Sequence, residues 1–217
     1  MRVGVLGTGT VGRTIATKLV ELGQEVTMGS RSPDGEALRE WTSEAGEGAN
    51  GGSFADAAAA AELVFNCTAG GASLDALGAA GAENLAGKTL VDVANPLDFS
   101  AGGPPTLSVC NDDSLGERIQ AAFPEARVVK ALNTINAGIM VAPEKVGGDH
   151  ALFVCGNDAS AKAETTALLE DFGWPRERVI DLGDISAARG TEMYLPLWLR
   201  LMGALGSAEF NIEVRRA

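Results

Sequence analysis

Gly7-Thr8-Gly9-Thr10-Val11-Gly12 has the pattern G-x-G-x-x-G and lies near the N-terminus of the chain. The short apolar run Arg2–Leu6 comes directly before it and has the composition of a strand buried on both faces. Apolar residues at helical spacing follow, up to Leu22, and Gly23 stands where a helix commonly ends. The pattern is informative only between a strand and a helix, and both are expected here. The sequence therefore predicts the first strand–turn–helix unit of a dinucleotide-binding fold.

Each glycine of this stretch has its own physical role. Gly7 lets the chain turn sharply, Gly9 lets the backbone approach a pyrophosphate, and Gly12 lets the helix pack against the strand. The N-terminus of the following helix presents free N–H groups and a partial positive charge, both of which attract phosphate. We therefore expect the whole stretch to hold a dinucleotide, with contacts from Gly7, Thr8, Gly9, Thr10, Val11 and Gly12.

The end of the second predicted strand selects the nucleotide. NAD sites place an Asp or Glu on the ribose about 20 residues beyond the glycine loop. Here the strand Glu25–Met28 is followed by Gly29, Ser30, Arg31 and Ser32, with no acidic residue. A carboxylate would repel a 2′-phosphate, whereas the planar guanidinium of Arg31 and the hydroxyls of Ser30 and Ser32 can donate hydrogen bonds to it. The cofactor is predicted to be NADP(H).

Strand and helix patterns alternate along most of the remaining chain, which is typical of parallel sheets with helices on both faces. We therefore expect an α/β fold of the Rossmann type, doubly wound and mostly parallel. Residues 1–189 would form this NADP-binding domain. Residues 190–217 would add a small C-terminal extension to the same globule, with a helix over Gly190–Leu205 and an edge strand at Phe210–Val214. The further strands are expected at Leu63–Cys67, Thr89–Val93, Arg127–Lys130, Leu152–Cys155 and Arg178–Asp181.

Open α/β sheets bind their ligands beyond the carboxyl ends of the strands. Three loops there are rich in small and amide residues that can approach a flat ring closely, although each could equally be an ordinary strand–helix connection. The segment 96–110 has the length of a loop that is usually functional or mobile. The three loops contain the candidate contact residues: Thr68 and Ala69; Asn95 and Pro96; and Ala131, Asn133, Thr134 and Ile135.

The catalytic side chains of common dehydrogenases are missing. Ketone reduction also moves a proton, which requires a positioned Tyr, Lys or His. Tyr194 is the only tyrosine and Trp198 stands four residues on, so the Tyr-x-x-x-Lys arrangement is absent. His150, the only histidine, is expected at the surface, and too few residues follow the sheet for the helical domain of a β-hydroxyacid dehydrogenase. What remains is hydride transfer between NADP and a second carrier, which needs positioning and no catalytic residue.

Composition limits the partners. The 217 residues carry a net charge of −12 and no cluster of Lys and Arg, so neither nucleic acid nor an anionic membrane surface is expected to bind. No apolar stretch reaches the ~20 residues of a membrane span, and no signal peptide is recognisable. Cys67, Cys110 and Cys155 form no CxxC pair, and with a single histidine no metal site is expected. These features favour a cytoplasmic protein with reduced thiols.

Three motifs together resemble the family of coenzyme F420-dependent NADP oxidoreductases: Gly7–Gly12, Gly29–Arg31 and Val129–Ile135. The resemblance covers nearly the whole chain. F420 is an 8-hydroxy-5-deazaflavin that carries hydride. The resemblance implies that Thr8–Val11 and Ser30–Arg31 hold NADP. It also implies a homodimer whose C-terminal segment helps to close the site. The loops that would line the nicotinamide and the deazaflavin are Thr68–Ala69, Asn95–Pro96 and Asn133–Ile135.

Two functions remain open on these grounds. In the first, the protein is an enzyme that transfers hydride between NADP(H) and F420, a flavin or another small acceptor such as a quinone or an imine. Its cleft would be roofed by the segment 96–110 and the C-terminal helix. In the second, it is a non-catalytic NADP(H) sensor whose apolar stretch Leu195–Leu199 docks a partner protein. The preferred interpretation of that stretch is core or dimer interface.

Overall fold

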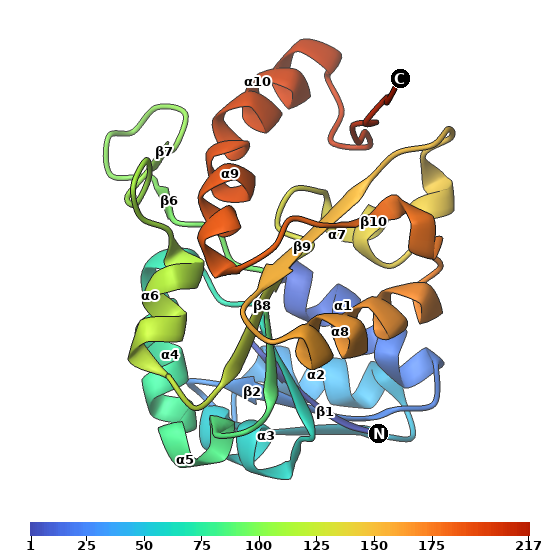
Figure 1. Cartoon of the computed structure of the whole chain (residues 1–217). Helices are drawn as coiled ribbons and strands as arrows, with labels where there is room; N and C mark the ends of the chain where they lie inside the picture. The colour runs from blue at the N-terminus through green and yellow to red at the C-terminus, as the bar shows by residue number, and fades with distance from the viewer.

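The computed structural model describes residues 1–217 and contains one large sheet. Eight strands pair in the order β10-β9-β8-β5-β4-β1-β2-β3, and every neighbouring pair is parallel except β8 with β9. The predicted α/β, mostly parallel fold is therefore confirmed (Figure 1). The strands are β1 (Arg2–Leu6), β2 (Glu25–Ser30), β3 (Ala49–Ser53), β4 (Leu63–Asn66), β5 (Thr89–Asp92), β8 (Arg127–Ala131), β9 (Leu152–Gly156) and β10 (Val179–Asp181).

Helices cover both faces of this sheet, as a doubly wound fold requires. One apolar core lies under α1 (Thr10–Glu21), α2 (Glu36–Ala45), α7 (Ala137–Met140) and α8 (Ala159–Asp171). The second core lies under α3 (Phe54–Ala60), α4 (Ser73–Ala80), α5 (Ala82–Leu85) and α6 (Leu115–Ala122). In Figure 1, α4 and α6 stand on one side of the sheet and α1 and α8 on the other. Short 3-10 turns occupy Gly70–Ala72, Pro143–Lys145, Arg176–Arg178 and Ile185–Ala187.

The first helix ends as the sequence predicts. Leu22 caps α1, and Gly23 follows with a φ of 77°, in the left-handed region that a glycine enters without strain. The Gly23 N–H donates to the Val20 carbonyl at 2.8 Å, and the Gln24 N–H donates to the Leu19 carbonyl at 3.0 Å. These bonds satisfy carbonyls that the helix leaves free, so the chain reverses at once into β2.

The C-terminal extension consists of α9 (Ala188–Met193) and α10 (Leu195–Leu205), with Pro196 in the first turn of α10. The expected edge strand at Phe210–Val214 is wrong, because residues 206–217 form neither helix nor strand. One backbone bond, from the Ala151 N–H to the Ile212 carbonyl at 2.9 Å, attaches this tail. The side chain of Asn211 donates to the Ala151 carbonyl, the group with which a strand partner would have paired.

The segment 96–110 is more ordered than the predicted loop. Its short strands β6 (Leu97–Asp98) and β7 (Thr106–Leu107) form a two-stranded antiparallel sheet, with Leu97 opposite Leu107. We call residues 96–110 the hairpin. In Figure 1 it projects beyond the main sheet, on the same side as α9 and α10.

His150 is buried, so its predicted surface position is wrong. Its Nδ1 lies 2.9 Å from the side-chain nitrogen of Asn211, and its Nε2 lies 3.0 Å from the carbonyl oxygen of Pro143. Because Asn211 donates to Nδ1, the ring proton is on Nε2 and is donated to the carbonyl. The edge of one ring meets the face of the other between His150 and Trp174, at 5.1 Å. His150 thus joins the C-terminal tail to the core.

None of the helices combines the length and the apolar composition that crossing a bilayer requires.

Candidate functional site

The glycine loop connects β1 to α1 through two close backbone contacts. Gly7 has a φ of +119°, and a Cβ on it would lie 2.7 Å from the Cys67 carbonyl oxygen. A Cβ on Gly12 would lie only 2.0 Å from the carbonyl oxygen of Gly7. Since real Cβ atoms essentially never approach within 3.0 Å, both positions admit only glycine without a shift of the backbone. The turn at Gly7 and the helix contact at Gly12 are therefore as predicted.

The N-terminus of α1 is free to receive an anion. Gly9 caps the helix with no side chain, and no acidic residue lies in the first turn. A Cβ built on Gly9 would meet no atom within 4 Å, so the backbone there faces open space. Free N–H groups and the positive end of the helix dipole thus point at an accessible surface, which is the physical requirement for binding a pyrophosphate.

Arg31 stands at the carboxyl end of β2, next to this opening. It is exposed and has no carboxylate partner among the ion pairs of the chain. The Ser30 hydroxyl oxygen accepts a hydrogen bond from the Ser32 N–H at 3.1 Å, so the proton of that hydroxyl remains available. In a chain of net charge −12, an unpaired guanidinium flanked by two hydroxyls suits a phosphate monoester.

A cavity of about 250 Å³ opens at the carboxyl ends of β4 and β5, next to the first turn of α1. The chain runs from β1 through β2 to β3 in one direction of the sheet and from β4 to β5 in the other. The cavity therefore lies at the switch point of the strand order, where open α/β sheets bind ligands. The side chains that line it are small or apolar: Val11, Cys67, Thr68, Ala69, Gly70, Val93, Ala94, Asn95, Leu97 and Phe99.

Four of the predicted contact residues meet in this cavity: Val11, Thr68, Ala69 and Asn95. Phe99, in the hairpin, was missed, although a lone aromatic in a loop already expected to be functional was a usable signal. Its side chain is 66% exposed, which is unusual for a phenylalanine and places an apolar ring beside the opening.

The last residue of β8 and the loop after it lie behind the cavity wall. Ala131, Asn133, Thr134 and Ile135 are all buried, and none lines the cavity. The Asn133 side chain donates to Asn95 Oδ1 at 2.9 Å, and the Asn95 side chain donates in return to the Asn133 carbonyl at 2.7 Å. This pairing clamps the two loops together. Ligand contacts by these four residues stay a prediction, as do those by Pro96.

The backbone conformation of Leu132 indicates that its neighbours hold this loop in place. Its φ is 63°, in the left-handed region that a leucine rarely enters. Such a conformation costs on the order of 1–3 kcal/mol and persists only where the surroundings fix it, most often at a functional site. The amide pair of Asn133 with Asn95 is one such constraint.

A buried charge next to the cavity was also missed. Lys130 lies in β8 and forms ion pairs with Asp92 in β5 and Glu192 in α9. From the sequence pattern, Lys130 is expected only as an ordinary strand residue. A lysine at the centre of an apolar strand, with an aspartate at the end of a neighbouring strand, was the available signal.

None of the side chains that line the cavity is a ready acid or base. Cys67 is its one titratable residue, and burial raises the pKa of the thiol far above its usual range, with Asp92 adding to the effect. Burial also raises the pKa of Cys155, to about 12. The cavity can therefore accommodate a flat ligand, but none of its side chains is an acid or base suited to proton transfer at neutral pH.

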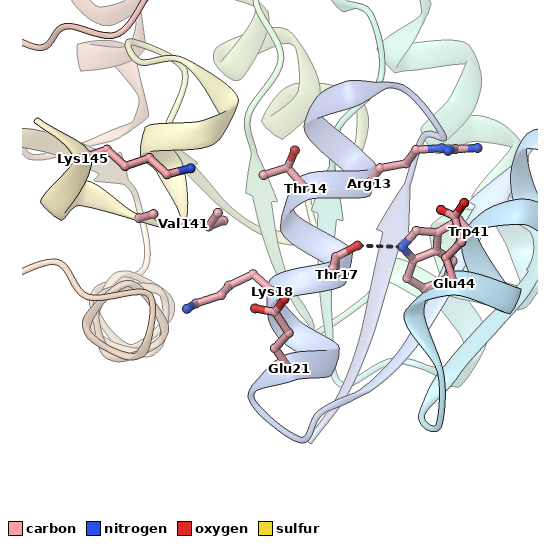
Figure 2. A pocket seen from close by; sticks show the side chains of 10 residues that line it. Arg13, Thr14, Thr17, Lys18, Glu21, Trp41, Glu44, Val141 and Lys145 are labelled. Carbon is pink, nitrogen blue, oxygen red and sulfur yellow. Dashed lines mark hydrogen bonds between the residues drawn. The ribbon is translucent and has the colours of Figure 1, made fainter.

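Two further concavities, each of about 440 Å³, lie elsewhere on the molecule. One runs along α1 towards α2 and is lined by charges of both signs, among them Lys18, Lys145 and Glu21 (Figure 2). The indole N–H of Trp41 donates to the Thr17 hydroxyl at its edge. No predicted site residue lines it. The other concavity separates the hairpin, at Pro104–Leu107 and Cys110, from Pro196, Leu199 and Arg200 of α10.

The sheet order, the glycine loop and the free N-terminus of α1 define a dinucleotide-binding α/β protein. Comparison with known proteins then identifies the family. Residues 2–96 match the family described as "NADP oxidoreductase coenzyme F420-dependent". A crystal structure from Arthrobacter sp. FB24, provisionally described as an F420-dependent NADP-reductase, is 58% identical over the whole of both chains, with a TM-score of 0.95. The chain belongs to the F420-dependent NADP oxidoreductase family.

Two curated relatives are more distant. The F420-dependent NADP reductase of Methanothermobacter marburgensis is 28% identical over 212 residues, which are 93% of this chain and 92% of the relative. The metalloreductase STEAP3 of Rattus norvegicus is 30% identical over 208 residues, or 91% of this chain. The match spans only 38% of the length of STEAP3.

Proposed function

We propose that this protein transfers hydride between NADP(H) and the deazaflavin coenzyme F420. The observation that carries the proposal is the alignment of three features along one edge of the sheet. These are the unpaired Arg31, the free N-terminus of α1, and the small-residue cavity at the switch point. They match in order the 2′-phosphate, the pyrophosphate and the nicotinamide of NADP. Bound NADPH would supply the hydride.

The residues of the chain contribute position rather than proton transfer. Thr68, Ala69 and Asn95 leave room for a flat ring at the cavity wall, and the lining carries no charged side chain. Hydride transfer between two rings needs them about 3–3.5 Å apart in a water-poor site, and this geometry supplies most of the rate. The hairpin would shield the site, with Phe99 and Leu97 as its apolar surface.

The choice of F420 as acceptor rests on the relatives. The Methanothermobacter protein bears the name of an F420-dependent NADP reductase and covers nearly the whole chain. The Arthrobacter structure, which is 58% identical to this chain, has the same description in provisional form. A flavin, a quinone-like compound or an imine would also meet the geometric requirement for a flat acceptor. The acceptor therefore has to be tested directly.

The test is an acceptor comparison with purified protein. NADPH oxidation is followed at equal concentrations of F420, FMN and FAD, and NADH replaces NADPH as the nucleotide control. We expect turnover with NADPH and F420 that exceeds turnover with either flavin by at least about tenfold, because correct ring placement contributes several kcal/mol to such reactions. Tight NADPH binding without reduction of any acceptor would overturn the proposal and favour an NADP(H) sensor.

We propose further that two copies of the chain associate through α9 and α10. Leu197 is 55% exposed and Leu205 60%, and Met193 adds a third exposed apolar side chain. The family resemblance implies a homodimer closed by its C-terminal segment. Analytical ultracentrifugation should give about twice the chain mass of 22.2 kDa, and Leu197→Asp should shift the protein towards the monomer. A wild-type monomer at micromolar concentration would contradict this arrangement.

A further inference from the structure

A charged cluster is buried between the sheet and the C-terminal helices. The Nζ of Lys130 lies 2.7 Å from Asp92 Oδ2 and 2.7 Å from Glu192 Oε1, and all three side chains are at most 1% exposed. The third N–H of the ammonium donates to the Ala94 carbonyl at 2.5 Å. Burial disfavours the ammonium, but the two carboxylates outweigh it and hold the pKa of Lys130 above its ordinary value. Lys130 is therefore charged throughout the physiological range.

One end of this cluster reaches the wall of the cavity. Asp92 Oδ1 accepts hydrogen bonds from the side-chain nitrogen of Asn66 at 2.8 Å and from the Ala94 N–H at 3.2 Å. Asn66 Oδ1 in turn accepts the hydroxyl proton of Thr68 at 2.6 Å. Thr68 and Ala94 both line the cavity. The cluster thus fixes two neighbouring parts of the wall from behind.

The other end fixes the C-terminal extension. Glu192 Oε2 accepts the Leu115 N–H at 2.8 Å, and Oε1 accepts the Gly116 N–H at 3.1 Å. These are the first amides of α6, so the carboxylate also lies at the positive end of a helix dipole. Glu192 therefore joins α9, α6 and β8 through directional bonds, and each of its oxygens accepts at least one of them.

Such a cluster is a poor source of stability. Removing an ammonium group and two carboxyl groups from water costs several kcal/mol for each group that carries a charge. Apolar side chains of similar volume commonly serve stability as well or better. The cluster's hydrogen bonds are directional, so they restrict the register of α9 against β8 and α6. Through Asp92 the same cluster is linked to the cavity walls.

We propose that Glu192 is a positioning residue for hydride transfer. It holds α9, and with it α10, in fixed register with the cavity walls at Thr68 and Ala94. The α10 helix carries Pro196 and Leu199, which face the hairpin across the concavity that Pro104–Leu107 also line. The inference rests on the proposed function, since its kinetic consequence requires a hydride acceptor that binds next to the hairpin and α10.

The variant Glu192→Gln tests the proposal with little change of shape. Its single oxygen cannot serve both Lys130 and the Leu115 N–H, so its amide group must face one of these donors. We expect kcat to fall at least about tenfold, because small misplacements of reacting groups have effects of this size or larger. KM for NADPH should change less than twofold, since the glycine loop and Arg31 do not contact the cluster and the bonds from Asp92 to the cavity wall do not involve Glu192. Amides of residues 188–205 should exchange hydrogen at least tenfold faster, and those of β1 and α1 as in wild type.

Arg189→Gln is the matched control. Arg189 binds Glu117 through two hydrogen bonds of 2.6 and 2.8 Å, and this pair also joins α9 to α6. It lies partly exposed and has no connection to the cavity walls. We expect kcat and exchange in residues 188–205 to stay within about twofold of wild type, as for a surface pair.

A triple variant separates the effect of the charged cluster on the position of α9 from its effect on the stability of the protein. Asp92→Asn with Lys130→Met and Glu192→Leu replaces the ions by neutral side chains of similar size and should melt within a few degrees of wild type. We expect it to show the lowered kcat and the unchanged KM for NADPH. Wild-type kcat in this variant would overturn the proposal.

The hydrogen-exchange experiment does not depend on which acceptor the protein reduces. It is run with NADP alone, so it remains decisive even if F420 is not reduced and the proposed function fails. Unchanged exchange in residues 188–205 of Glu192→Gln would overturn the proposal. Faster exchange throughout the whole chain would do so as well, because the cluster would then be a general stabiliser. Equal effects of Arg189→Gln would show that any link between α9 and α6 suffices.

Discussion

Arg31→Ala is expected to weaken NADPH binding by about 1.5–3 kcal/mol, or roughly 10- to 150-fold in Kd, and to leave NADH binding nearly unchanged. The guanidinium has no carboxylate partner in the protein, so its removal leaves no buried group unsatisfied. The whole effect should therefore come from the lost charge-assisted hydrogen bonds to the 2′-phosphate, which NADH lacks. Titration calorimetry with both nucleotides measures the difference directly.

Arg200→Ala is the control for this substitution. Arg200 is also exposed and without an ion pair, but it lies in α10, beyond the hairpin. It carries the same charge, so any change in the general attraction of a nucleotide to the protein should be similar in both variants. NADPH affinity in Arg200→Ala should stay within about twofold, since exposed charges act weakly at a distance in salt. Equal losses of NADPH and NADH affinity in Arg31→Ala would show that this side chain does not recognise the phosphate.

Two alanine substitutions in the glycine loop should separate folding from binding. In Gly12→Ala the new Cβ would lie 2.0 Å from the Gly7 carbonyl oxygen, so α1 has to shift. Overpacking of this kind costs about 1–3 kcal/mol, which lowers Tm by roughly 2–4 °C per kcal/mol in a chain of this size. Gly9→Ala meets no atom within 4 Å and has an ordinary φ of −74°, so Tm should change by less than about 1 °C.

For NADPH affinity we expect the opposite order from that for Tm, with the larger loss in Gly9→Ala. The methyl group of Gly9→Ala occupies the space through which a pyrophosphate approaches the backbone, so NADPH affinity should fall at least about tenfold while the fold persists. Calorimetric melting and nucleotide titration on the same samples give both quantities. If Gly9→Ala bound NADPH as wild type does, the pyrophosphate would have to lie elsewhere.

Much of the fold follows from local sequence. The strand Arg2–Leu6, the glycine loop and Gly23 specify the first unit, because turns and helix ends depend on a few adjacent residues. The errors concern contacts between distant segments. His150 was expected at the surface, yet Pro143 and Asn211 enclose it. The tail at Phe210–Val214 has a strand-like composition, but Asn211 takes the carbonyl with which a strand would pair.

In the candidate site, too, some features follow from local sequence and others from contacts between distant segments. The position of Thr68, Ala69 and Asn95 in the cavity wall was predictable, because residues just beyond the carboxyl ends of parallel strands meet at one edge of the sheet. Asn133 was placed on the same argument, and the structure shows its amide paired with Asn95 behind the wall. The direction of a loop side chain depends on what its neighbours offer, and no pattern in the sequence encodes that.

Local sequence specifies the glycine loop, the lack of an acidic residue after the second strand and the alternation of strands and helices that builds a parallel sheet. All three are set by neighbouring residues and their backbone preferences. The enclosure of Lys130 by Asp92 and Glu192 next to the cavity depends instead on the folded arrangement of the chain. Those three side chains come from segments far apart in the chain, and their charges become tolerable only when folding brings them within hydrogen-bonding distance.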